Sequence, residues 1–302
     1  STSLPPSSPT SGGTRGRSKP PLAGPSALKT RVGGPHHARA VSCRSSKFAG
    51  VGVIPERQRE LLAGRHRLRR SRSAGGSEQE GYSTDDAMTW LLGIDDPDDI
   101  PAGFELTEFV AGLADAWDDT QRQKLIPYLP RVALVRTDYL AEGERAARAS
   151  QWIRRTWTPA WYRLAGLPDD EDERYHFDTD PAPALEVALR RDGHALDAAI
   201  ALIGKSDARR ALDMAKDATA QAFDTSGWQA VSRISSSGQS RWDRAVTESL
   251  MSAVACEAAA KNRRSGDWHR EADRVAADEA LTPTVRTLQS EMLALLEELI
   301  AV

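Results

Sequence analysis

Several features that commonly identify a function are scarce in this 302-residue chain. It has two cysteines, Cys43 and Cys256, too few for a disulfide framework, and we expect both to be reduced thiols. Its longest apolar stretch, Ala195 to Gly204, contains Asp197 and is far shorter than the roughly 20 residues that span a bilayer. No terminal apolar run follows a basic start, so no secretory signal is expected. We therefore expect a cytoplasmic protein with no membrane partner.

Methionine is absent before Met88, and the composition changes just ahead of that residue. Residues 1–77 contain fifteen Lys or Arg and two acidic residues, a formal charge of +13. The remainder contains twenty-five Lys or Arg and forty-one Asp or Glu, a formal charge of −16. The overall charge of −3 therefore conceals a basic segment joined to an acidic one.

The basic segment is rich in Ser, Pro, Gly, Thr and Arg, and residues 1–50 cannot bury enough apolar surface to offset the entropy of ordering a backbone. We predict that residues 1–84 are disordered, apart from a short helix over Glu56–Ala63 with Pro55 at its first position. Three interpretations are open. The segment is not natively translated, because GC-rich DNA encodes this composition in many frames; or it is a disordered tail or linker; or it is an arm for nucleic acid or an acidic partner.

The arm interpretation depends on a dense cationic run, whose arginines are Arg65, Arg67, Arg69, Arg70 and Arg72. Such a run would neutralise phosphates and make binding steeply salt-dependent. It lacks the interleaved aromatic residues that stack on bases, so the run by itself is a weak signal for nucleic acid.

Residues 85–302 show apolar residues at helical spacing and no alternating β-branched runs that would predict a sheet. One such stripe consists of Leu106, Phe109, Val110, Leu113 and Trp117. We predict an all-α domain, a helical bundle or irregular helical array of about seven to nine helices.

Capping residues and helix breakers predict where these helices begin and end. Asp118-Asp119-Thr120 predicts the start of a short helix, and Gly193 predicts a break. A longer helix is predicted from about Leu140 to Thr156, followed by a new one that begins at Thr158-Pro159. The acidic, proline-containing loop over residues 168–183 is the best candidate for an internal domain boundary.

The C-terminal helix is predicted to begin with Thr282 as its cap and Pro283 as its first residue. Its apolar residues follow a heptad seam: Leu281, Val285, Leu288, Met292, Leu295, Leu299 and Val302. One interpretation is self-association as a coiled coil through the seam from Val285 to Leu299. Leu293, Leu296 and Ile300 widen the apolar face beyond a two-stranded seam, which favours packing within the chain.

The richest aromatic neighbourhood is flanked by arginines that would stack on its rings. The residues of this candidate ligand groove are Trp152, Arg155, Trp157, Trp161 and Arg163. The functional interpretation is a groove for an anionic or planar ligand. The favoured interpretation is a set of tryptophan anchors between helices, with the arginine stems lying over them.

No motif in the chain has the residue spacing that a catalytic, phosphate-binding or metal-binding site requires. The stretch Ile203-Gly204-Lys205-Ser206 lacks the upstream glycine of a phosphate-binding loop. His176, His194 and His269 are too widely separated to predict a zinc site. Cys256 lies among small helical residues, a context typical of an inert buried thiol. We assign no catalytic, cofactor-binding or metal-binding residue and expect no cofactor.

Three stretches together resemble a group of Ala- and Trp-rich helical proteins from high-GC actinobacteria. They are Leu125–Val132, then Thr158–Trp161 with Leu164, and finally Leu281–Val285 leading to Leu295-Leu296. The resemblance covers about Met88 to Val302 and is weaker from Asp169 to Ser240. It implies an all-helical cytoplasmic protein and carries no known activity, so it transfers no catalytic residue.

The leading hypothesis is a non-enzymatic protein-interaction or accessory module that binds an unidentified protein or self-associates. One alternative is a hydrolase or transferase whose site is assembled in tertiary space near Trp152–Trp161. The other is nucleic-acid binding through the basic arm.

Overall fold

The computed structural model describes residues 51–71, 81–101, 104–135, 138–166, 182–235, 240–266 and 270–302. Every described residue belongs to one compact unit, Lys47–Val302. All regular elements of the described residues are helical, and a single β-bridge joins Leu68 to Tyr82. The predicted all-α class is therefore confirmed.

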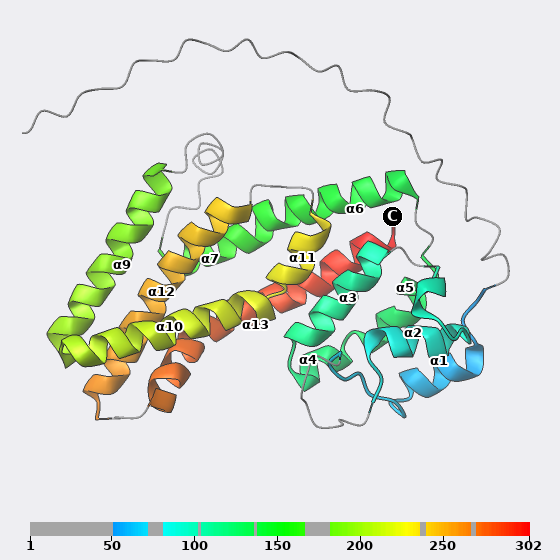
Figure 1. Cartoon of the computed structure of the whole chain (residues 1–302), viewed down its shortest axis with the longest axis horizontal. Coiled ribbons are helices and arrows are strands. Elements are labelled where there is room, and N and C mark those ends of the chain that lie inside the picture. The colour runs from blue at the N-terminus through cyan, green and yellow to red at the C-terminus, as the bar shows by residue number, and fades with distance from the viewer. Residues whose placement is uncertain are drawn as a thin grey trace, which may run out of the picture. The chain divides into compact units, whose positions relative to one another are not determined.

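The elements follow one another along the described chain in this order: α1 Pro55–Leu62, α2 Thr84–Leu92, the 3-10 turn η2 Pro97–Asp99, α3 Phe104–Ala116, α4 Asp119–Gln123, the 3-10 turn η3 Ile126–Tyr128, α5 Leu129–Val132, α6 Tyr139–Trp152, the π-helical turn η4 Ile153–Trp157, α7 Thr158–Leu164, α9 Ala182–Ile203, α10 Lys205–Thr225, α11 Trp228–Ile234, α12 Ser240–Arg264 and α13 Arg270–Ile300. Within this unit, α9, α10, α12 and α13 form a group of long helices, and the short helices α1 to α5 gather at the other end (Figure 1). The helix α12 packs against α9, α10 and α13, whereas α3 packs against α2 and α11.

Aromatic side chains join the middle of the fold. The ring of Trp157 lies 4.3 Å from that of Trp228 and 5.0 Å from that of Phe223, centroid to centroid. Trp161 contacts the same Phe223 ring at 5.1 Å. Because these rings come from η4, α7, α10 and α11, their burial ties together segments that are distant in the sequence.

The domain boundary predicted over residues 168–183 is wrong for the described part of the chain. The helices on its two sides belong to one unit and share one hydrophobic core, to which Ala165 and Ala188 both contribute. The physical reason is that α12 packs against α7, before the loop, and also against α9, after it. Residues 167–181 themselves lie outside the described residues.

The prediction that residues 1–84 are disordered is wrong for residues 51–71 and 81–84. The helix α1 forms as predicted, with Pro55 in its first turn. The amide of Ile54 donates to the carbonyl of Leu91 at 2.9 Å, and Leu61 and Leu68 are 1% and 2% exposed. Leu61 and Leu68 are therefore core residues, although the basic composition of the sequence around them predicts disorder. Residues 1–50 and 72–80 lie outside the described residues.

Three predicted helix breaks are absent, because packing on both sides of each break holds the helix together. Gly193 lies inside α9, between the buried residues Ala188 and Ala195. Pro283 lies inside α13, which therefore begins well before the predicted cap and continues through a position that lacks an amide donor. Thr158-Pro159 follows the π-helical turn directly, so α6, η4 and α7 form one uninterrupted helical stretch.

The heptad seam of α13 is used within the chain. Leu288, Met292, Leu295 and Leu299 are at most 2% exposed, and Val285 packs partly buried against the same core. Intramolecular packing, the favoured interpretation, is confirmed. The prediction of self-association through this seam is wrong, because its apolar side chains are already buried in the core of the same chain.

Candidate functional site

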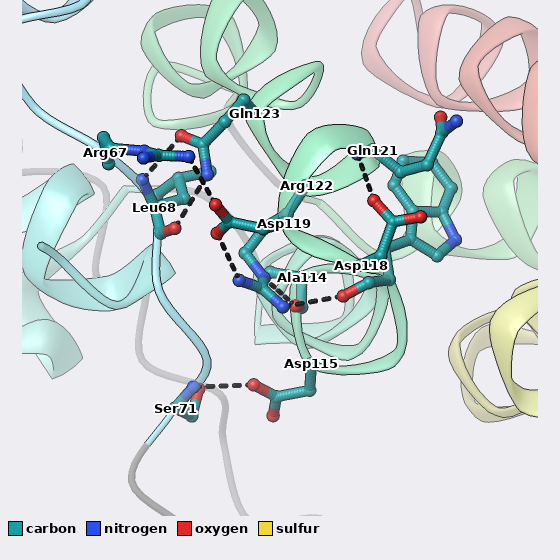
Figure 2. A network of polar contacts seen from close by, with 11 residues as sticks. Arg67, Leu68, Ser71, Ala114, Asp115, Asp118, Asp119, Gln121, Arg122 and Gln123 are labelled. Carbon is teal, nitrogen blue, oxygen red and sulfur yellow. Dashed lines mark hydrogen bonds and ion pairs between the residues drawn. The ribbon is translucent and has the colours of Figure 1, made fainter. Parts of the chain in front are cut away.

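The segment Arg65–Ser71, which we call the strap, lies against the end of α3 and the short helix α4 (Figure 2). Its centre is fixed by Gln123, whose side-chain amide accepts from the Leu68 amide at 2.9 Å and donates to the Leu68 carbonyl at 2.9 Å. The Ser71 amide donates to the carboxylate of Asp115 at 2.6 Å. On its other side the strap pairs with Tyr82, which accepts from the Arg69 amide at 2.8 Å.

Arg122, a residue that is only 3% exposed, places its guanidinium beneath the strap (Figure 2). It donates to the carbonyl of Ala114 at 2.5 Å and to that of Trp117 at 2.7 Å. These carbonyls lie at the C-terminal end of α3, where a helix lacks its own donors and favours positive charge. Asp118 caps α4 through the amide of Gln121 at 2.8 Å, so the predicted start of this helix is confirmed.

Most arginines of the strap have partners. Arg67 forms an ion pair with Asp119, which also binds Arg122 at 3.1 Å. Arg69 pairs with Asp86 at 3.1 Å and donates to a backbone carbonyl of Gly81. Arg65 reaches only to within 4.0 Å of a carboxylate on α1, at the limit of an ion pair.

Arg70 differs from its neighbours. It is exposed and makes no hydrogen bond or ion pair with a described residue. Burial lowers the pKa of Arg122, and the charge of Arg70 lowers it further, whereas Asp119 acts in the opposite direction. Two like charges are therefore held close together, one buried and one without a counterion among the described residues.

A hollow of about 630 Å³, open to solvent, lies between the strap and α4. Its lining consists of Arg67, Leu68, Arg69, Arg70, Asp118, Asp119 and Arg122. Four arginines and two aspartates give the lining a formal charge of +2. The arginines of this lining offer several N–H donors to an oxygen anion.

The structure thus assigns the predicted cationic run to a folded surface. Arg67, Arg69 and Arg70 all line the hollow, and Arg72 lies outside the described residues. Sequence reasoning missed Arg122, because a lone arginine in a short polar helix gives no signal of burial. It also missed that two aromatic rings, those of Tyr82 and Trp90, contact His66 of the strap at 5.2 and 4.7 Å.

The predicted ligand groove around the tryptophans is wrong. Trp157 and Trp161 are 0% exposed and Trp152 is 8% exposed, so their rings fill the core instead of lining a groove. The indole N–H of Trp157 donates to the Ser226 hydroxyl at 3.0 Å, in a fully buried position. Arg155 and Arg163 are exposed on the adjoining surface. The favoured interpretation, tryptophan anchors between helices, is confirmed.

The other residues considered for chemistry are placed as follows. Cys256 is a buried free thiol, and burial raises its pKa to about 11, as expected of an inert cysteine. His194 is exposed on α9, and the other two histidines considered lie outside the described residues. Within the described ranges, no three His, Cys, Asp or Glu side chains are grouped so that they would hold a metal ion.

No protein-family description, curated protein or solved structure matches this chain. The resemblance to Ala- and Trp-rich actinobacterial proteins therefore stays a prediction. None of the described helices is both long enough and apolar enough to cross a membrane.

Proposed function

We propose that this chain is a non-enzymatic protein-interaction module whose arginine-lined hollow receives a single anionic group, a phosphate or a carboxylate, from a partner protein. The observation that carries this proposal is the position of Arg70. Its guanidinium has no counterion among the described residues and lies near enough to the buried Arg122 to lower the pKa of that residue. An anion placed between them would relieve the repulsion and accept charge-assisted hydrogen bonds.

The charge distribution favours one anionic group over a polyanion. Arg67 and Arg69 are already paired with Asp119 and Asp86, so they supply little free positive charge. Asp118 also lines the hollow and would repel a continuous row of phosphates. Residues 78–302 carry a formal charge of −16, which opposes long-range attraction of nucleic acid. We therefore favour a partner protein over nucleic acid.

The test uses the full chain and three fluorescent probes: a short Gly/Ser peptide with one phosphoserine, the same peptide unphosphorylated, and an oligothymidylate. Arg70→Gln removes the unpaired charge, and because the side chain is exposed the fold should be unaffected. The matched control is Arg155→Gln, which removes an exposed arginine elsewhere on the surface. Fluorescence anisotropy gives the affinity of each variant for each probe at low and physiological salt.

The expected result is that the phosphopeptide binds more tightly than its unphosphorylated form. Arg70→Gln should weaken that binding roughly tenfold or more, the scale of a charge-assisted hydrogen bond, while Arg155→Gln leaves it unchanged. Equal affinity of the two variants would place the site elsewhere. Steeply salt-dependent binding of the oligothymidylate alone would replace the protein partner with nucleic acid.

A further inference from the structure

The strap is attached to the rest of the chain mainly by polar contacts. Of its residues, all of which the structure describes, only Leu68 is buried, and Arg65, Arg67 and Arg70 are exposed. Hydrogen bonds and an ion pair join the strap to α3, to α4 and to Tyr82. A segment with so little buried apolar surface opens at a lower cost in free energy than the core does. We therefore expect the strap to detach locally while the remaining helices stay folded.

One contact between the strap and the rest of the chain is repulsive. Arg70 belongs to the strap and Arg122 to α4, and both line the same hollow. Arg122 cannot withdraw, because the carbonyls of Ala114 and Trp117 accept hydrogen bonds from its buried guanidinium. Burial and then the charge of Arg70 lower the pKa of Arg122. Without an anion between them, the two guanidinium groups therefore oppose closure of the strap.

An anion between these two arginines reverses the sign of the contact. It accepts from Arg70 on the strap and from Arg122 on α4 at the same time, so attraction through the anion replaces repulsion. Arg122 has donors to give, because each of its terminal nitrogens carries a second N–H besides the one bonded to Asp119 or Trp117. This bridge exists only while the strap is closed. The anion therefore binds the closed form more tightly and shifts the population towards it.

We propose that the strap is controlled by the hollow that it lines: an anion bound between Arg70 and Arg122 closes the strap, and loss of the anion favours its release. This inference rests on the anion site proposed above and adds that occupancy of the site regulates the strap. By reciprocity, a change that loosens the strap also weakens the binding of the anion. The anionic group of a partner thus docks in the hollow and orders the segment that lines it.

The test measures hydrogen exchange of the full chain at constant pH and ionic strength. The amides of Leu68, Arg69 and Ser71 report closure, because each donates a hydrogen bond when the strap is in place. The probes are the Gly/Ser peptide with one phosphoserine and its unphosphorylated form. Arg70→Gln removes the repelling charge. The matched control is Arg65→Gln, which removes an exposed arginine of the same strap that does not line the hollow.

Without peptide, Arg70→Gln should slow the exchange of the strap amides several-fold, because the repulsion is gone, whereas Arg65→Gln should leave it unchanged. The phosphopeptide at ten times its dissociation constant should slow exchange roughly tenfold in the unaltered chain and in Arg65→Gln. It should have no such effect on Arg70→Gln. The unphosphorylated peptide should leave the exchange of all three proteins unaltered.

The reciprocal effect has its own measurement. Gln123→Ala deletes both hydrogen bonds to Leu68, and Gln123 does not line the hollow. The variant should nevertheless weaken the binding of the phosphopeptide several-fold, as measured by fluorescence anisotropy. Gln151→Ala, an exposed glutamine on α6, is the control and should bind as the unaltered chain does. Equal affinity of the two variants would show that the strap and the anion are not coupled.

The failure of this inference and the failure of the anion site have different signatures. If the phosphopeptide binds through Arg70 but the exchange of the strap stays the same, control of the strap is overturned and the anion site stands. If the phosphopeptide does not bind, the anion site fails and control of the strap fails with it. Exchange in Arg70→Gln that is no slower than in the unaltered chain, without peptide, would overturn the repulsion between Arg70 and Arg122.

Discussion

The Nε atom of Arg263 on α12 lies 2.8 Å from a carboxylate oxygen of Asp273 on α13, and both side chains are almost completely buried. The same guanidinium reaches Asp207 at the start of α10, with 2.9 Å between nitrogen and oxygen. One arginine therefore joins three helices at the end of the long-helix group. A buried pair of this kind contributes to stability only while both partners are present.

Replacing Arg263 by Met should strongly destabilise the unit, because Asp273 would be left buried without its cation. We expect a loss of about 3–5 kcal/mol in the free energy of unfolding, measured by urea denaturation. Arg274→Gln removes a half-exposed arginine that pairs with Glu271 and Asp278 on the same helix, and it should change the urea midpoint far less. Similar midpoints for the two variants would show that the buried pair has no special importance.

The strap should loosen when its central anchor is removed. Gln123→Ala deletes both hydrogen bonds to Leu68, and we expect a loss of about 1–3 kcal/mol. Trypsin should then cut faster after the strap arginines under native conditions. Gln151→Ala, an exposed glutamine on α6, serves as the control and should leave the cutting rate unaltered. Unchanged cutting in both variants would contradict the role given to Gln123.

Gly227 should tolerate no side chain. Its φ of +88° lies in the left-handed region, and an added Cβ would lie 2.3 Å from the methyl carbon of Met292. Gly227→Ala should therefore cost about 2–5 kcal/mol, from backbone strain and overpacking together. Gly64, just after α1, also has a left-handed φ of +72° but open space around it, so Gly64→Ala should show the backbone strain alone, about 1–2 kcal/mol. Equal losses in thermal or urea denaturation would show that the Met292 contact relaxes freely.

Asp192 should make the unit less stable as pH rises. Burial raises its pKa above the ordinary value of 3.8, and one of its carboxylate oxygens is buried without a hydrogen-bond partner among the described residues. The folded state therefore holds a proton that the unfolded state has released, between pH 3.8 and the raised pKa. Across that window, stability falls with increasing pH, because the folded state must bury a charge.

Asp192→Asn removes this titration. The variant should therefore gain stability relative to the unaltered chain as pH rises above 3.8, and the gain should level off once Asp192 is ionised in the folded state too, as measured by urea denaturation. Asp213→Asn, at an exposed position on α10, is the control and should follow the unaltered chain. A pH-independent difference between the unaltered chain and the Asp192 variant would contradict the assignment.

Local pattern predicted much of the secondary structure. The stripe from Leu106 to Trp117 is buried as its helical spacing predicts, Asp118 caps its helix, and the seam of α13 faces the core. These features depend on hydrogen bonds and side-chain neighbours within a few residues, which spacing alone encodes. Charge counts likewise located the cationic run that contains Arg67 and Arg70.

Only the tertiary structure decided what those residues do. Leu68 meets Gln123 across 55 residues of chain, and Arg67 meets Asp119 across 52, so no local pattern could predict the strap or its hollow. Packing also kept α9 and α13 continuous through Gly193 and Pro283, where local propensity predicted breaks. The sequence thus determined which segments become helices. The free energy of long-range burial determined where helices continue and which arginine, Arg70, is left without a described partner.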